Sequence, residues 1–453
     1  MPVALSSLIS PIESGNTTGS VPDRVTREGL LARFRRISDH RSTRNVRHPL
    51  ASILALAACG VAVVGGDSII AVWHWAFDAC LQEVLAELEV WRDPFTGLHV
   101  PPSERTFRRV LGEIDGDQLD REVCAYLAGQ APRPAKAPGR PDTPGTARPD
   151  TAERAERAER AERAWSNERE ARRVRQRDRE HPAMAGLLPA AAADGKAIRG
   201  ARRPDGRRPQ LLSLFCHTRH TTLAQRAIDT ETSEVPELKP LIAEVDLAGT
   251  VLTADALHTV RETARHLAED LGAYYVLILK HNQPALLATA MAALADGTDA
   301  EHERAGTGHT ETDRGHGRSE RRTIRTAPAD GVDFPGAVQV MRIVRHVADL
   351  RGSGGSKQVA YAITNLPAHL AGPAHLGTYV RGHWGVETRA HYVRDVTFGE
   401  DAGRIRTGAL PQVMATCRNL ATGAFRHVGH VNMAYARRHY RNDARRLLTL
   451  FDL

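Results

Sequence analysis

The chain has few cysteines, and their spacing does not suggest that they pair. Its 453 residues include five cysteines, an odd number at wide spacings, with no CxxC pair and no Cys/His zinc spacing. A disulfide framework and a structural zinc site are therefore not expected, which is typical of proteins in a reducing cytosol. Phosphate-binding loops of the GxxxxGK[ST] and GxGxxG types are also absent, so the common nucleotide-binding motifs are excluded.

Long apolar runs and a secretion signal are lacking too. The N-terminus does not have the basic-then-apolar pattern of a signal peptide. The longest apolar run, from Leu50 to Val64, is Ala-rich and is followed by Gly65, Gly66 and Asp67. It is too short to cross a bilayer comfortably. We interpret it as a buried helix and expect no membrane partner.

Positive charge is in slight excess, and the excess is local. The net charge is +7 and the pI about 9.4. From Arg381 to the end, 12 Arg stand against 6 Asp plus Glu, which gives +6 and nearly the whole excess. Such a surface favours an anionic partner, and nucleic acid is the leading candidate. The hydrophobic fraction of 42% and the charged fraction of 25% are those of a globular protein.

Changes in composition divide the chain into four segments. Residues 1–24 are rich in Ser, Thr, Gly and Pro and are expected to be disordered. Helical spacing over 25–128 predicts a separate all-α domain that could bind DNA. Residues 129–182 join a Pro-rich piece to an Ala/Glu/Arg repeat without an apolar stripe, which indicates a partly helical linker. Residues 183–453 are expected to form the catalytic domain, with a basic helical C-terminus.

In the N-terminal domain, one predicted helix carries a row of arginines. Ser103 is a candidate N-cap at its start. Arg105, Arg108 and Arg109 would lie along this helix and could contact DNA phosphates. A solvated helix face is the alternative.

The last segment alternates predicted strands and helices. The order strand, helix, strand, helix, strand implies a parallel portion of sheet covered by helices, and hence an α/β fold with a mixed sheet. The stretch 296–325, rich in Gly, His and Arg, carries no predicted element. Strands are predicted over residues 184–193, 210–219, 221–229, 250–258, 273–280, 338–347 and 358–366, and helices over 234–246, 259–272 and from 375 onward.

Three carboxylates lie at the ends of these elements. Asp194 ends an apolar run and is followed by Lys196 and Arg199, Asp255 ends a second strand, and Glu387 lies on a predicted helix. Carboxylates from separate elements can hold two divalent ions about 4 Å apart, one activating the attacking oxygen and one stabilising the leaving oxygen. This set therefore predicts a site for phosphodiester chemistry.

Each of these acids also has a structural interpretation. Asp194 could belong to an Asp-Gly turn, and Asp255 could cap the helix that follows it. Glu387 could be a surface acid paired with an arginine. Glu400 and Asp401 are rival candidates for the third carboxylate.

Five ordered motifs resemble bacterial insertion-sequence transposases of the DDE superfamily. They span about half the chain, and they look most like the ISAs-type branch of the group with the signature Y-x2-R-x3-E-x6-K. Val380, His383 and Arg394 stand where that signature has Tyr, Arg and Lys. RHPLASILALA and PSERTFRRVL resemble the helical domain associated with that branch. The five motifs are DGKAIRG (194–200), VLTADALHT (251–259), YVLILKHNQ (275–283), DRGHGRSERR (313–322), and RGHWGVE (381–387) with DVTFGEDAGRIR (395–406).

The resemblance implies a ribonuclease-H-like catalytic domain in which Asp194, Asp255 and Glu387 bind two Mg²⁺ ions, with Mn²⁺ as a substitute. It implies hydrolysis at transposon ends and then attack of the freed 3′ hydroxyl on target DNA. The partners would be double-stranded DNA, at the inverted-repeat ends and at the target, and further copies of the chain in a homodimer or larger synaptic assembly. The protein would be cytoplasmic and nucleoid-associated.

A set of basic and aromatic residues near these motifs is predicted to contact DNA. Trp384 could instead be a packing residue, and Arg318 could belong to a β-turn. Asn282 and Gln283 could serve only as caps of the helix that begins near Pro284. A nuclease that cuts without joining, and a non-catalytic DNA-binding protein derived from a transposase, remain as alternative functions. The predicted DNA contacts are Lys196, Arg199, Arg318, Arg381, Trp384, Arg394, Arg404 and Arg406.

Overall fold

The fold is taken from a computed structural model. The predicted linker lies outside the described residues from position 131 on, and so does the predicted disordered N-terminus apart from a short strand β1 (Val3–Ala4), which pairs in parallel with β5 (Val245–Asp246). The structure describes residues 3–4, 28–42, 44, 46–79, 81–130, 186–228, 233–315, 317–350 and 355–453.

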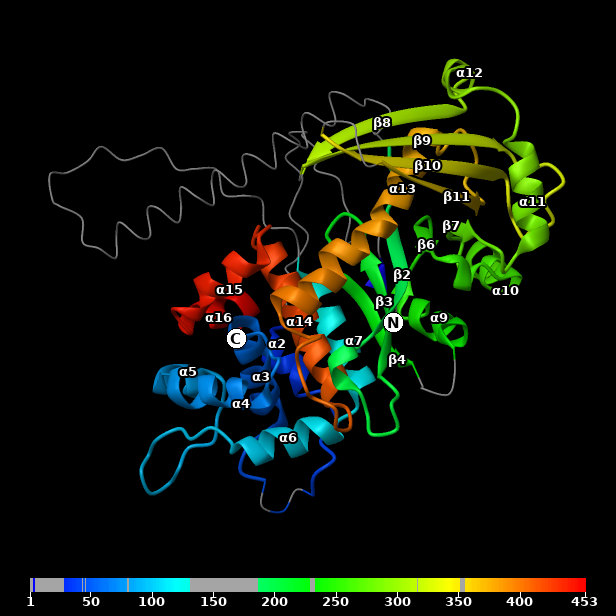
Figure 1. Ribbon diagram of the computed structural model, residues 1–453. Coiled ribbons are helices and arrows are strands. Elements are labelled where there is room, and N and C mark those ends of the chain that lie inside the picture. The colour runs from blue at the N-terminus through cyan, green and yellow to red at the C-terminus, as the bar shows by residue number, and fades with distance from the viewer. Residues whose placement is uncertain are drawn as a thin grey trace, which may run out of the picture.

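A nine-stranded mixed sheet forms the centre of the structure, in the order β4-β3-β2-β6-β7-β11-β10-β9-β8 (Figure 1). β2 pairs in parallel with β6, and β6 with β7, whereas the other neighbours are antiparallel. The five strands from β4 to β7, with their helices, are the ribonuclease-H-like unit. The strands are β2 (Ala190–Ala197), β3 (Gln210–Cys216), β4 (Thr222–Ile228), β6 (Val251–Ala254), β7 (Tyr274–Leu279), β8 (Gly308–Gly315), β9 (Arg318–Pro328), β10 (Gln339–Asp349) and β11 (Ser356–Thr364).

The strands predicted from apolar runs are present, but β8 and β9 were not predicted. β8 has the sequence GHTETDRG, in which no apolar residue alternates with the polar ones. It is an edge strand, and it pairs with β9 along its whole length. Ion pairs such as Arg322 with Glu311, 3.0 Å apart, take the place of apolar contacts across this pair. A period-two hydrophobic pattern could not reveal such a strand.

Helices cover both faces of the sheet. α9 (Glu234–Ile242), α10 (Arg261–Arg265) and α11 (Pro284–Ala293) pack on one face, and α13 (Pro373–Val386) packs on the other. Along β2, the side chains of Ala191 and Ala193 join the first core, whereas Ala190 joins the core under α13. Because side chains alternate along a strand, Asp194, which follows Ala193, points to the same face as Ala190 and so faces α13.

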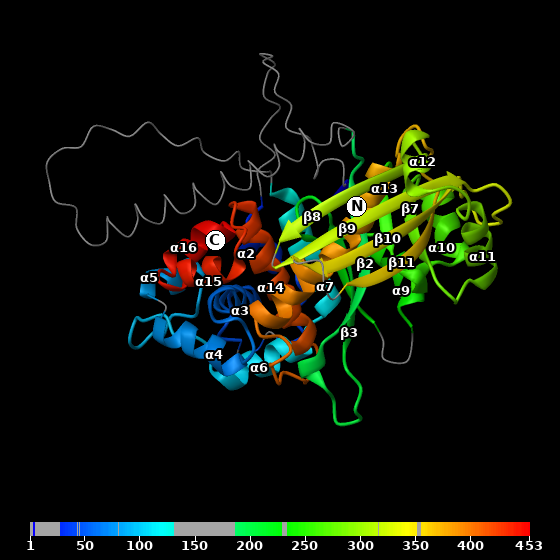
Figure 2. The same cartoon turned by 45° about the horizontal axis from the view of Figure 1, so that its top comes forward.

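The N-terminal region is helical, as predicted, but it does not form a separate core: it shares one core with the C-terminal helices (Figure 2). α3 is buried along almost its entire length, from Leu50 to Val63. A helix that is apolar on all sides has to be covered on all sides, and the short neighbouring helices cannot do this alone. The helices of this lobe are α2 (Leu30–Phe34), α3 (Leu50–Val64), α4 (Ile69–His74), α5 (Gln82–Glu87), α6 (Glu104–Glu113), α7 (Gly116–Gly129), α14 (Leu410–His427), α15 (Met433–Arg441) and α16 (Arg445–Phe451).

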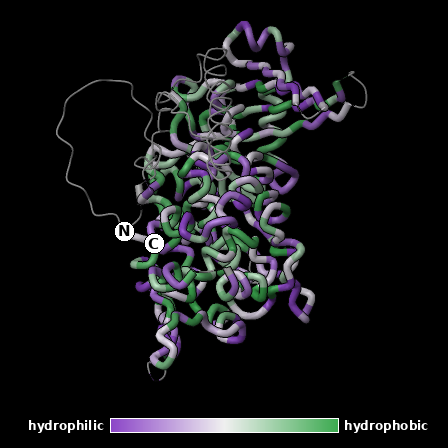
Figure 3. Tube along the Cα trace, turned by 90° about the vertical axis from the view of Figure 1, so that its left-hand side faces the viewer, coloured by the Kyte–Doolittle hydropathy of each residue, from purple (hydrophilic) through white to green (hydrophobic). Residues whose placement is uncertain are grey.

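The longest apolar segment is the core helix that the sequence predicted. Among the described residues no single helix is long and apolar enough to cross a membrane, and α3 passes such a test only together with Ile69–Asp78, from which it is bent by 105°. Hydropathy along the trace agrees with this layout (Figure 3). Hydrophilic residues gather at the top of the molecule, around α12 (Asp299–Arg304), while hydrophobic residues recur throughout the body.

Candidate metal centre

The sheet register places Asp194 and Asp255 side by side. Ala193 of β2 pairs in parallel with Ala254 of β6, and the two aspartates are the next residue of each strand. Residues at the same level of adjacent parallel strands point to the same face. That face is the one covered by α13, and the pair lies at the carboxyl end of β6 and in the second half of β2; ligand sites of open α/β sheets are usually found at the carboxyl ends of strands.

Glu387 and His391 approach this edge from the end of α13. They lie four residues apart in the π-helical turn Glu387–His391 that continues α13. His391 Nδ1 lies 3.4 Å from Glu387 Oε2 and 3.6 Å from Asp194 Oδ2. One ligand atom from each of these three residues falls within 4.8 Å of the other two. Carboxylate oxygens and an imidazole nitrogen are donors that divalent cations accept, so this group fits a metal ion.

The acids influence one another's protonation. Burial raises the pKa of Asp194 to about 6, the nearby His391 opposes that rise, and Glu387, Asp255 and Glu234 add to it. A hydrogen bond from His391 holds the pKa of the more exposed Glu387 below its ordinary value. A cation bound beside Asp194 would favour the ionised form of this carboxyl group. The electrostatics therefore agree with the donor set.

This raised pKa predicts a stability change with pH in metal-free protein. The pKa of Asp194 is about 6 when folded, against an ordinary 3.8, so the folded state holds the proton more tightly. Its contribution to stability is present below pH 3.8 and is lost as pH rises through 6, a loss of up to about 3 kcal/mol. We expect Asp194→Asn to raise the free energy of unfolding at pH 8 more than at pH 5, as measured by urea denaturation in EDTA. Asp205→Asn, at an exposed site, is the control, and equal changes at both pH values would contradict the prediction.

Asp255 has a structural role in addition to its position beside Asp194. Its Oδ1 accepts a hydrogen bond of 2.9 Å from Leu257 N and so caps the short helix Ala256–His258. Asn282 and Gln283 help to hold this turn, because they donate to the carbonyls of Ala256 and Thr259 at 2.7 and 2.8 Å. They do not cap the helix that follows them through their side chains.

Glu400, the rival third carboxylate, is buried in an ion-pair network. Its side chain is 0% exposed, and its oxygens accept hydrogen bonds from Arg394 at 2.8 and 3.0 Å and from Arg418 at 2.8 Å. Arg418 also donates to the carbonyl of Gly66 at 2.7 Å, at the end of α3. With its oxygens bound by two guanidinium groups inside the protein, Glu400 ties the helical lobe to the segment after α13.

Two of the predicted DNA contacts, Lys196 and Arg394, belong to this network and are buried. The side chain of Lys196 is 6% exposed, and its Nζ pairs with Asp395 at 2.6 Å. The side chain of Arg394 is 4% exposed and bound to Glu400. Both cations are therefore occupied by ion pairs inside the protein. The positive charge counted in the C-terminal sequence is thus partly internal.

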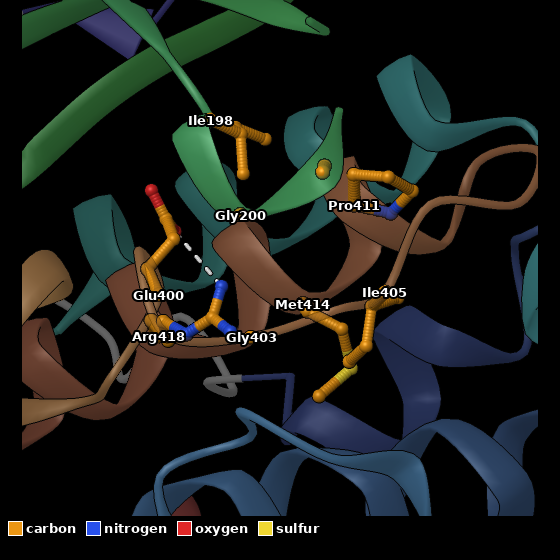
Figure 4. Close-up of a pocket in the computed structure, with 9 residues that line it drawn as sticks. Ile198, Gly200, Glu400, Gly403, Ile405, Pro411, Met414 and Arg418 are labelled. Atoms are coloured by element: carbon orange, nitrogen blue, oxygen red, sulfur yellow. Dashed lines mark hydrogen bonds and ion pairs between the residues drawn. The ribbon is translucent and has the colours of Figure 1, made fainter. Parts of the chain in front are cut away.

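A small cavity lies beside the network (Figure 4). Its volume is about 10 Å³, and Ile198, Met414 and Arg418 are among its lining residues. That is room for about one water molecule and for no substrate. Gly200 is required here, because a Cβ at this position would lie 2.2 Å from the carbonyl oxygen of Gly403. The cavity marks close packing between the loop after β2 and the DVTFGEDAGRIR segment.

The other predicted DNA contacts differ in exposure. Arg318, Arg404 and Arg406 are exposed. The side chain of Arg199 is 73% exposed, with Asp401 at 3.8 Å. The side chains of the remaining two, Arg381 and Trp384, contact other parts of the protein. Arg381 pairs with Glu311 at 3.2 Å, and Trp384 packs against the core under α13, as the alternative interpretation expected.

Sequence reasoning missed the histidines around the acids. His391 joins Asp194 and Glu387, and the E-x3-H spacing on a predicted helix could have revealed it, because residues four apart share a helix face. His383 is also close to the acids, and its Nδ1 lies 3.3 Å from Thr253 Oγ1. Burial lowers the pKa of His383 to about 4. Glu234 of α9 fills the space beside Gly195, where a Cβ would lie 2.2 Å from the carboxyl carbon. No local sequence pattern predicts the contact between Glu234 and Gly195.

Two family models match this chain. A model described as "Transposase DDE domain" matches residues 185–422. A second, described as "DDE_Tnp_1-associated", matches residues 31–127 in the helical lobe.

Curated relatives are more distant. The chain is 24% identical over 244 residues to "Putative transposase YncI" of Escherichia coli O157:H7, a match that covers 52% of this chain and 61% of that protein. It is 37% identical over 102 residues to "Uncharacterized protein in dhlA 3'region" of Xanthobacter autotrophicus, over 22% of this chain and 34% of that protein. The matched regions span less than two thirds of these relatives. Among solved structures, a piggyBac transposase synaptic complex with hairpin DNA matches at 10% identity and a TM-score of 0.31, over 58% of this chain and 52% of that chain.

Proposed function

Because this chain belongs to the transposase DDE domain family, whose model matches residues 185–422, we propose that it is a metal-dependent DNA transposase. It binds the terminal inverted repeats of an insertion sequence, cuts the DNA there and joins the ends to target DNA. We also propose, from the resemblance of its motifs, that it belongs to the ISAs-type branch with the Y-x2-R-x3-E-x6-K signature. The observation that carries the proposal is the placement of Asp194 and Asp255 in register, with Glu387 reaching the same face from α13.

In this proposal Asp194, Asp255 and Glu387 hold two Mg²⁺ ions, for which Mn²⁺ can substitute. Such ions activate an attacking water or hydroxyl and stabilise the departing oxygen of a phosphodiester. The residues of the chain fix the geometry: the register of β2 with β6 sets the spacing of the aspartates, and the network around Glu400 holds the segment after α13 against β2. A rigid frame of this kind supports phosphoryl transfer, which depends on positioning and charge stabilisation.

Double-stranded DNA is the proposed partner, at the nucleoid, in a homodimer or larger synaptic assembly. The catalytic domain is proposed to span residues 183–453 and to be joined by the linker over 129–182 to the helical domain over 25–128, whose core it shares through α14, α15 and α16. Arg404 and Arg406 are exposed in the segment that follows Glu400, and Arg199 and Arg318 are exposed as well. We propose that these four contact phosphates.

A strand-transfer assay tests the function. The full chain is incubated with Mg²⁺, a labelled duplex that carries an end of the element, and a supercoiled target plasmid. Labelled DNA covalently joined to the plasmid is the expected result. Cleavage without joining would replace the transposase with a nuclease, and binding without cleavage would replace it with a non-catalytic DNA-binding protein. Asp255→Asn keeps an oxygen to cap Leu257 N and is expected to bind DNA without cutting it.

The phosphate contacts predict a specific salt dependence. We expect the double variant Arg404→Ala/Arg406→Ala to weaken DNA binding and to reduce the slope of log affinity against log salt by about 2, since each phosphate contact contributes about 1. Fluorescence anisotropy between 50 and 200 mM salt measures both quantities. Arg304→Ala, at an exposed arginine on α12, is the control. An unchanged slope in the double variant would remove these residues from the interface.

A further inference from the structure

The metal centre contains a nitrogen donor in addition to its acids. His391 is nine-tenths buried, and its Nδ1 faces two carboxylates that come from different elements, Asp194 on β2 and Glu387 after α13. A buried polar ring aimed between two acids is placed to share a cation with them. Asp255, which lies beside Asp194, is not a member of this group of three.

The geometry agrees with a shared ion. In an octahedral site with bonds of about 2.1 Å, ligands on adjacent corners lie about 3 Å apart. The Nδ1 atom of His391 is 3.4 Å from Glu387 Oε2 and 3.6 Å from Asp194 Oδ2. These two distances from the histidine nitrogen exceed that spacing by only about half an ångström. Glu387 has the freedom to move, because its side chain is 73% exposed.

The histidine lies in an irregular part of the helix that continues α13. Glu387 and His391 begin and end one π-helical turn, and a second such turn, Val393–Thr397, follows. Single π-helical turns often occur at functional sites. Lys196, buried beside Asp395, holds β2 against this second turn. Packed structure therefore holds Asp194 and His391 in place, whereas the exposed side chain of Glu387 can adjust to an ion.

We propose that His391 is a metal ligand, and that its nitrogen makes this position favour Mn²⁺ over Mg²⁺. The inference rests on the proposed function, because it describes one of the two metal positions in that site. Mg²⁺ takes oxygen ligands and gives up water reluctantly. Imidazole is a ligand of first-row transition ions, so two carboxylates with one imidazole select these ions over Mg²⁺. A structural bridge, in which His391 only links two acids, is the competing interpretation.

Spectroscopy of bound Mn²⁺ distinguishes the two. The full chain is titrated with Mn²⁺ alone, free ion is measured by electron paramagnetic resonance, and electron spin-echo modulation tests for a directly coordinated ¹⁴N. We expect ¹⁴N modulation in the native protein and none in His391→Ala or His391→Asn, with Mn²⁺ affinity about tenfold lower or weaker still. His391→Asp should restore Mn²⁺ affinity without the ¹⁴N signal. Its preference for Mn²⁺ over Mg²⁺ should be smaller than that of the native protein.

A neighbouring histidine provides the control. His258 is 1% exposed, and its Nε2 lies 3.6 Å from Glu234, so His258→Gln tests whether the nitrogen comes from there. Modulation that survives in folded His391→Asn, or that is absent from native protein with Mn²⁺ bound, would overturn the proposal. Circular dichroism melting confirms that the variants fold. A ¹⁴N signal without DNA cleavage would refute the proposed function alone, and cleavage without the signal would refute the ligand alone.

Discussion

Glu387→Gln is expected to lower the rate of DNA cleavage about a thousandfold and to leave thermal stability unchanged. A catalytic metal contributes several kcal/mol to transition-state stabilisation, and each 1.36 kcal/mol changes the rate tenfold. The Glu387 side chain is 73% exposed, so the substitution creates no buried defect. Single-turnover cleavage of a labelled end duplex measures the rate, and a thermal melt measures stability.

The control for this variant is another exposed glutamate. Glu83 of α5 is 72% exposed and pairs with Arg445 in the helical lobe. Glu83→Gln removes the same charge at nearly the same exposure, and its cleavage rate should match that of the native protein. A Glu387→Gln protein that cuts at the native rate would exclude Glu387 as the third carboxylate.

Glu400→Gln is expected to destabilise the fold by about 3–5 kcal/mol, which is the usual cost of removing one partner from a buried ion pair. Glu400 is the acid shared by Arg394 and Arg418, whose side chains are 4% and 3% exposed. Without it, two guanidinium groups remain inside the protein with their main counter-charge removed. Urea denaturation measures the free energy of unfolding.

The neighbouring acid Asp401 supplies a matched control. Its side chain is 28% exposed, and it lies 3.8 Å from Arg199. Surface pairs of this kind contribute about 0–1 kcal/mol, so Asp401→Asn should change stability little. If Glu400→Gln folded normally and lost cleavage while Glu387→Gln stayed active, the third carboxylate would be Glu400 and the assignment would have to be exchanged.

Much of the fold followed from local patterns. Apolar runs predicted the strands that form the ribonuclease-H-like unit, because their buried residues are contiguous in sequence. Ser103 was recognised as a helix cap, and its side chain accepts a hydrogen bond of 3.3 Å from Thr106 N. β8 and β9 were missed because ion pairs between the strands replace hydrophobic alternation. The shared core was missed because α3 and α14 are some 350 residues apart in sequence.

Part of the site could be predicted from local sequence patterns as well. Asp194 and Asp255 stand at the ends of apolar runs, and parallel strands bring such ends together. Glu387 was predicted as the third acid, with Glu400 and Asp401 as rivals that local sequence could not exclude. Burial separates them, since one side chain is 73% exposed and the other 0%.

The sequence by itself determined the strands built from apolar runs, the positions of the candidate acids and the resemblance to a transposase family, because each depends on residues close together in the chain. Tertiary structure alone decided which charges face solvent. Arg394 and Arg404 are ten residues apart and equally polar, yet one is buried against Glu400 and Gln225 while the other is exposed. Burial depends on partners from distant segments, and these meet only when the chain folds.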